Sequence, residues 1–266
     1  MEEPGKLSLK ELYEEARHAR DICNDREAGI RYEDLLFRDP ENWETVFFTA
    51  YYSAKKNRFE DTEGTAKAIS AAFEKSLDRL CAVNAEDNVS ARKAFHTLMK
   101  FFNNYVDSFT AGCVSGFLYP GETGVALDKQ GCLKKLRIML SLVSRAQETI
   151  EGLSEDRLAL LGEEALGTVY LPELYMKTVE IGTRYLNFTD DGRAPFIIRR
   201  SGKRLLDTID KNTALIRETE PFYIPPYCRA REAFSHEARR KTVLLGIIAA
   251  AFFLNVALAL YFVFKP

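Results

Sequence analysis

An uncharged run of 22 residues, from 243 to 264, limits what this chain can fold into more than any other feature. A helix of that length, rising 1.5 Å per residue, is about 33 Å long and can cross a hydrocarbon core of about 30 Å. A buried core helix is the alternative, but such a helix usually carries a polar stripe. We therefore expect one transmembrane helix over 243–264 and a soluble region before it.

Basic residues gather on one side of this run, whereas only Lys265 follows it. They are Arg229, Arg231, Arg239, Arg240 and Lys241. Segments rich in Lys and Arg stay on the cytoplasmic side of a bilayer, so we expect a single-pass membrane protein with a cytoplasmic N-terminal domain. The same cations either contact acidic lipid headgroups or only set the topology. This end of the chain resembles that of tail-anchored proteins, which implies insertion after synthesis.

One strongly polar residue, Asn255, lies near the middle of the apolar run, where an unpaired amide is costly. At about 100° per residue it shares a face with Ala251 and Ala259. Small residues beside an amide allow two helices to approach and to form a hydrogen bond, so this face is the expected association surface, in a homodimer or with a partner helix. The alternative is that Asn255 bonds to carbonyls of its own helix. A second small-residue face contains Gly246, Ala250 and Ala257.

The soluble part is expected to be all-α, because apolar residues recur at spacings of three and four and alternating β-branched patterns are scarce. The expected helices are at about 9–24, 26–38, 40–57, 62–83, 87–117, 128–151, 155–168, 172–187 and 196–217. Ser8 with Glu11 forms a capping box, and Asp25, Asp39 and Asp128 are further candidate caps. Gly152 ends one helix, and Pro172 begins another.

This reading divides the chain into four parts: a soluble helical domain (1–218), a proline-rich stalk (219–228), a basic juxtamembrane helix (229–242) and the transmembrane helix (243–264). The stalk is expected to be non-helical, because Pro225 and Pro226 lack backbone donors and have fixed φ angles. The juxtamembrane part contains helix-forming residues and no helix breaker.

Residues 9–42 resemble one tetratricopeptide repeat. The positions that match its 34-residue pattern of large, small, aromatic and proline residues are Leu12, Ala16, Ala28, Tyr32, Leu35 and Pro40. Glu15 and Ala19 depart from the pattern, and no second copy follows 34 residues later. The resemblance implies two helices that pack closely through small residues, with later helices stacked on them as a helical-hairpin array or bundle. An ordinary helical hairpin is the alternative.

The segment 36–43, Leu-Phe-Arg-Asp-Pro-Glu-Asn-Trp, is similar to the first homology motif of the Bcl family of apoptosis regulators. That family continues with Gly-Arg, whereas this chain continues with Glu44 and Thr45, and the match lies earlier in this chain than in the family. The alternative is that Trp43 is a core residue at the start of the third helix.

Composition argues against several functions. Lys and Arg total 37 and Asp and Glu total 39, so no basic excess is available to bind nucleic acid. The five cysteines are dispersed and form no CxxC pair, which indicates reduced thiols rather than disulfides or a zinc site. His18, His96 and His236 lie far apart in the sequence, and we identify no catalytic, cofactor or metal motif.

Three functions remain open. The first is a membrane-tethered interaction module, an adaptor or scaffold, whose partners are the lipid bilayer and an unknown protein. The second is a membrane-bound helical enzyme with an unrecognised site, and the third is an assembly protein driven by its anchor. An exposed groove would favour the first function, whereas a deep pocket with carboxylates of shifted pKa would favour the second.

Overall fold

A computed structural model describes residues 7–57, 59–83, 87–120, 126–189, 200–232 and 243–249. Within these ranges the secondary structure is helical and no strand occurs. The expected all-α class is therefore confirmed for the described part of the chain. Its helices are α1 (Leu9–Asp21), α2 (Asp25–Arg38), α3 (Trp43–Lys56), α4 (Thr62–Val83), α5 (Asn88–Leu118), α6 (Lys129–Glu151), α7 (Glu155–Leu161), α8 (Glu163–Ala165), the π-helix η1 (Leu166–Tyr170), α9 (Leu171–Thr189) and α10 (Arg200–Thr219).

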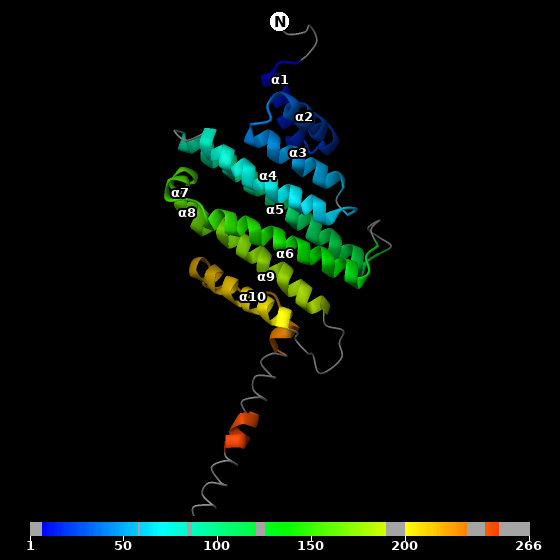
Figure 1. Ribbon diagram of the computed structural model, residues 1–266, viewed down its shortest axis with the longest axis vertical. Coiled ribbons are helices and arrows are strands. Elements are labelled where there is room, and N and C mark those ends of the chain that lie inside the picture. The colour runs from blue at the N-terminus through cyan, green and yellow to red at the C-terminus, as the bar shows by residue number, and fades with distance from the viewer. Residues whose placement is uncertain are drawn as a thin grey trace, which may run out of the picture.

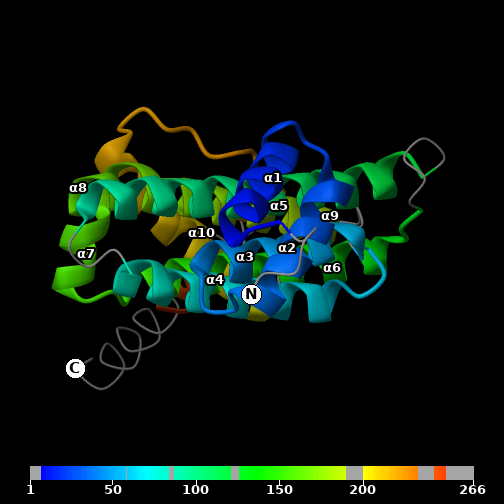
Figure 2. The same cartoon turned by 90° about the horizontal axis from the view of Figure 1, so that it is seen from above.

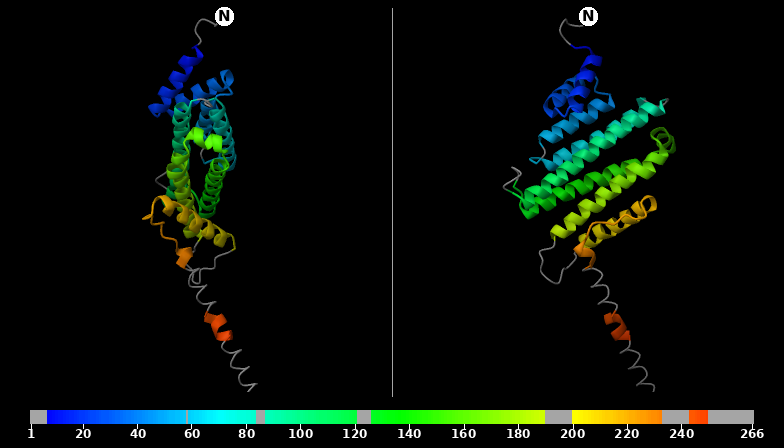
Figure 3. Two further views of the ribbon diagram at one scale, coloured as in Figure 1. Left: turned by 90° about the vertical axis from the view of Figure 1, so that its left-hand side faces the viewer. Right: turned by 180° about the vertical axis from the view of Figure 1, so that it is seen from behind.

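These helices stack one after another along the long axis of the molecule (Figure 1). α1 pairs with α2, α2 contacts α3, α3 contacts α4, and α9 contacts both α6 and α10. The middle of the stack has two layers, with α4 and α6 in one layer and α5 and α9 in the other (Figure 2 and Figure 3). On the outer side of each layer, two long helices therefore meet along a boundary: α4 and α6 in one layer, and α5 and α9 in the other.

Side-chain caps fix most helix starts, and two of them differ from the expectation. Ser8 and Glu11 form the predicted capping box on α1, and Asp128 caps α6. The third helix starts at Trp43 rather than near Pro40, because the side chain of Asn42, not that of Asp39, accepts the N–H of Glu44 at 2.9 Å. Asn24, rather than Asp25, caps α2 in the same way.

The expected break at Pro172 is absent, because α8, η1 and α9 follow one another without a gap. The chain breaks instead at Gly162, whose φ of +94° is a left-handed conformation that glycine adopts without strain. A proline inside a helix cannot donate to the preceding turn. Pro172 has no N–H to donate in any helical turn, and the π-helix η1 ends just before it, with Leu171 between them.

The core is rich in aromatic side chains, most of them on α3 and α5. Those with almost no exposed surface include Phe47, Phe48, Phe95, Phe102 and Phe109. Trp43, predicted to be a core residue, lies at the edge and is only partly buried, because it is the first residue of α3. The five cysteines are free thiols, and four of them are buried.

Residues 220–228, which follow α10, are non-helical, as the prolines predict, but they do not stand free of the domain. The side chain of Asn187 on α9 donates to the carbonyl of Tyr227 at 2.9 Å and accepts the N–H of Arg229 at 3.1 Å. Cys228 and Ala230 are buried against α9 and α10. The predicted stalk therefore ends in a strap packed on the last two helices.

The membrane-spanning prediction falls largely outside the described residues. Residues 243–249 are helical and lie away from the stack (Figure 1). Residues 250 to 264 lie outside the described part. Within the described ranges, no helix has both the length and the apolar character that a membrane crossing requires.

Candidate functional site

A groove runs between α4 and α6 on the outer side of one layer and has a volume of about 360 Å³. Its floor is apolar, formed by Ala66, Ile138 and Leu142. Its walls are polar and mainly basic. They are formed by Glu63, Lys67 and Ser70 of α4 and by Lys134, Arg137, Ser141 and Arg145 of α6.

Among the residues that line this groove, positive charge exceeds negative charge. Its one carboxylate, Glu63, takes a salt bridge from Lys67 at 3.0 Å, and this contact lowers the pKa of Glu63. Arg137 and Arg145 are exposed and form no salt bridge with any residue that the structure describes. Two guanidinium groups therefore remain available beside an apolar floor.

A second cleft of about 360 Å³ lies between α5 and α9 on the other layer. This second cleft is lined by Asp107, Thr110, Ala111, Glu173, Met176, Lys177, Glu180, Ile181 and Arg184. It contains both acidic and basic side chains, so it differs chemically from the mainly basic α4–α6 groove. Lys177 reaches across to Asp107 at 2.6 Å, and Arg184 pairs with Glu180 on its own helix at 2.5 Å. Most charges of this cleft are thus already paired.

Among the titratable groups that line this cleft, Glu173 has a clearly shifted pKa. Burial, reinforced by the negative charge of Asp107, raises its pKa above the usual value of 4.5, although the charge of Lys177 opposes this shift. At the end of the cleft toward η1, the ring nitrogen Nδ1 of His96 lies 3.0 Å from the hydroxyl of Tyr170. Of these three groups only Glu173 lines the cleft, and His96 lies near enough to affect its pKa; all three are of types that transfer protons in many enzymes.

The raised pKa of Glu173 predicts a pH-dependent stability. A carboxyl whose folded pKa exceeds its unfolded value stabilises the fold fully below the unfolded value and loses this contribution as pH rises through the folded value. Glu173→Gln has no such loss, so its melting temperature should improve relative to wild type as pH increases from about 4 to about 7. Thermal unfolding of both proteins across this range measures the difference. A difference that stays constant or shrinks would contradict the raised pKa.

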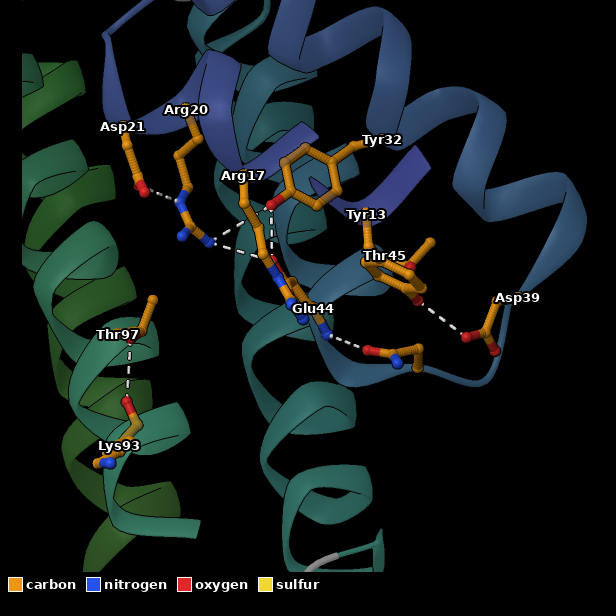
Figure 4. Close-up of polar contacts among 11 residues, drawn as sticks. Tyr13, Arg17, Arg20, Asp21, Tyr32, Asp39, Glu44, Thr45, Lys93 and Thr97 are labelled. Carbon is orange, nitrogen blue, oxygen red and sulfur yellow. Dashed lines mark hydrogen bonds and ion pairs between the residues drawn. The ribbon is translucent and has the colours of Figure 1, made fainter. Parts of the chain in front are cut away.

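A third site, a cluster of polar side chains, lies between the N-terminal helices. It centres on Glu44, which is only 3% exposed (Figure 4). Its carboxylate accepts from Arg17 at 2.6 Å, from Arg20 at 3.1 Å and from the Tyr32 hydroxyl at 2.7 Å. The cluster joins α1, α2 and α3, and burial beside this carboxylate raises the pKa of Tyr32.

A neighbouring hydroxyl extends the same network. Tyr13 donates to Asp39 at 2.8 Å and lies 2.8 Å from the hydroxyl of Thr45 (Figure 4). Burial raises the pKa of Tyr13 as well. Every polar group of this network meets another from the same chain, so we assign it to holding α1 on α2 and α3 rather than to binding a ligand.

Five of the six residues that carry the tetratricopeptide resemblance are buried, and one is exposed. Leu12, Ala16, Ala28, Tyr32 and Leu35 are buried between α1, α2 and α3. Pro40 is exposed in the turn before α3. Its carbonyl accepts a hydrogen bond from Arg79 of α4, so it ties the turn to the next helix.

The predicted basic and transmembrane residues are described only in part. Arg231 pairs with Asp210 of α10, and the backbone N–H of Arg229 bonds to Asn187, so both help to fix the strap. Arg239, Arg240, Lys241, Ala251, Asn255 and Ala259 lie outside the described residues. Gly246 is described, and a Cβ added there would meet no atom within 4 Å.

Sequence reasoning missed the groove and the Glu44 cluster for different reasons. Glu44 could have been noticed as the one acid in the aromatic segment WETVFFTAYY, where burial demands a partner. The groove residues Arg137 and Arg145 look like any solvated helix face until α4 is placed beside them.

No protein-family model, curated protein or solved structure matches this chain.

Proposed function

We propose that this chain is a membrane-tethered interaction module that binds a protein partner in the groove between α4 and α6. The α4–α6 groove carries the proposal, because it combines an apolar floor with two exposed arginines that form no salt bridge with the described residues. Interfaces commonly have an apolar centre with a polar rim, and arginine is enriched in them. An adaptor or scaffold role fits a surface of this kind.

The tether in this proposal is the apolar segment 243–264. Its described part, residues 243–249, is helical, and Val243, Leu244, Leu245, Ile247 and Ile248 are each between 55% and 65% exposed. So many adjacent apolar side chains without cover from their own domain need another apolar environment. A single-pass helix with the domain on the cytoplasmic side supplies that environment and agrees with the basic residues before the run. Within this helix, the Ala251, Asn255 and Ala259 face is the proposed association surface.

A membrane-bound enzyme is the second candidate function, and the cleft between α5 and α9 is the observation that favours it. Glu173, His96 and Tyr170 line or border this cleft, and the pKa of Glu173 is raised. Altered titratable groups in a cleft are common at catalytic sites. We rank this function second, because the two ion pairs already satisfy most of the charged groups there.

Affinity capture of the full-length protein from solubilised membranes tests the interaction role. Arg137→Glu/Arg145→Glu reverses the charge of the groove, and Arg26→Glu/Lys100→Glu makes the same charge change at exposed positions on α2 and α5. We expect wild type and the control to retain a partner that the groove variant loses, with weaker retention at higher salt. The same set of proteins bound by all three would contradict the proposal.

A further inference from the structure

The α4–α6 groove is about as long as three turns of an α-helix. On α6 its lining residues run from Lys134 to Arg145, and at 1.5 Å per residue this is about 16 Å, or three turns. On α4 they run from Glu63 to Ser70 along one helix face. A straight channel between two packed helices is the surface into which the ridge of a third helix fits.

The chemistry of the groove selects an acidic and partly apolar ligand. Four cations face one carboxylate, and that carboxylate is already paired with Lys67. Arginine forks form paired hydrogen bonds with carboxylates, so Arg137 and Arg145 are suited to Asp or Glu side chains. A free inorganic anion would leave the floor of Ala66, Ile138 and Leu142 uncovered.

The backbone of the ligand is constrained as well. The N–H and C=O groups of α4 and α6 are used within those helices, so the groove walls offer no edge to an extended strand. A helical ligand satisfies its own backbone and presents one apolar and one charged face. Because its rise per residue equals that of α6, acids spaced three, eight or eleven residues apart can follow Lys134, Arg137 and Arg145.

We propose that the α4–α6 groove binds an acidic amphipathic helix of a partner protein, with its apolar side on Ile138 and Leu142 and its carboxylates on Arg137 and Arg145. This inference rests on the proposed interaction function and names the class of segment that the groove takes. A flat anionic bilayer is the competing ligand. Ala66 and Leu142 are buried, which favours a narrow, convex ligand that can reach between the two helices over a planar one.

A designed peptide tests this inference on the full chain reconstituted in nanodiscs of neutral lipid. The probe is a fluorescein-labelled helix of about 15 residues with Leu on one face and Glu on the other. Two comparison peptides replace Glu by Lys or rearrange the same residues into alternation. We expect saturable binding of the Leu/Glu helix, detected by fluorescence anisotropy, and markedly weaker binding of both comparison peptides.

Two groove variants and one control complete the test. Arg137→Glu/Arg145→Glu should weaken binding about tenfold, and Ser141→Trp, which fills the groove without changing its charge, should weaken it to a similar degree. Arg26→Glu/Lys100→Glu should bind as wild type. Unchanged circular dichroism of each variant shows that the fold persists.

Three outcomes would overturn the inference. Equal binding of the alternating peptide would show that the groove takes acidic segments without requiring a helix. Displacement of the Leu/Glu helix by soluble short-chain phosphatidylserine at lower concentration than by unlabelled peptide would assign the groove to lipid headgroups. Failure of the helix to bind, with partner capture still dependent on Arg137 and Arg145, would reject the helical ligand and leave the interaction function standing.

Discussion

Replacing Glu44 by alanine is expected to destabilise the protein by about 3 to 5 kcal/mol, the usual cost of removing one partner from a buried ion pair. The side chain of Arg20 is 12% exposed, so most of its charge would lose its compensation in the interior. The Tyr32 hydroxyl would lose its acceptor as well. Arg17 is 51% exposed and would be resolvated by water. Denaturant unfolding followed by circular dichroism measures the loss.

Glu14→Ala is the matched control for this change. Glu14 also lies in the N-terminal helices and pairs with a cation, Lys10, at 3.9 Å, but both side chains are largely exposed. Its removal should change the free energy of unfolding by no more than about 0.5 kcal/mol. Equal effects of the two substitutions would show that the Glu44 cluster does not hold α1 on its neighbours.

The proposed tether predicts that the full-length chain behaves as an integral membrane protein and that truncation before Val243 releases it from membranes. Each apolar side chain transferred from lipid to water costs about 1.5 to 3 kcal/mol, and segment 243–264 contains many of them. Alkaline carbonate treatment of membranes, followed by assay of pellet and supernatant, measures the distribution. Full-length protein should remain in the pellet, and the truncated chain should appear in the supernatant.

Arg239→Gln/Arg240→Gln/Lys241→Gln is the control for the truncation. It removes the positive charge next to the run and leaves every apolar residue in place. This variant should stay in the carbonate pellet, because surface charge alone supplies only about 1 kcal/mol per basic residue. Release of the full-length protein, or retention of the truncated chain, would contradict the tether.

Helix content was predictable because each helix carries its own local signals. Ser8 with Glu11, Asp128 and Gly152 mark helix ends through contacts within three or four residues, and the structure confirms them. Asn42 caps α3 in place of Asp39, whereas Asp39 accepts the Tyr13 hydroxyl from another helix. Such a contact depends on a residue 26 positions away and leaves no mark in the local sequence.

The candidate site was less predictable because it forms only when separate helices meet. Arg137 and Arg145 acquire a distinct role from the position of α4, and Lys177 from its contact with Asp107, 70 residues earlier. The strap shows the same limit, since Pro225 and Pro226 predict a non-helical segment but not its attachment to Asn187. Periodicity describes one helix at a time, whereas a groove is a property of two.

A photo-crosslinking amino acid with a short aliphatic diazirine side chain, too small to fill the groove as tryptophan does, placed at position 141 of the full-length protein in intact membranes, would show whether the groove is occupied by a protein. Ser141 is exposed and lines the groove, whereas Lys100 is exposed on α5. The proposed function predicts one discrete protein adduct from position 141, lost on Arg137→Glu/Arg145→Glu, and none of that mass from position 100. No adduct from position 141, or the same adduct from both positions, would contradict binding in the α4–α6 groove.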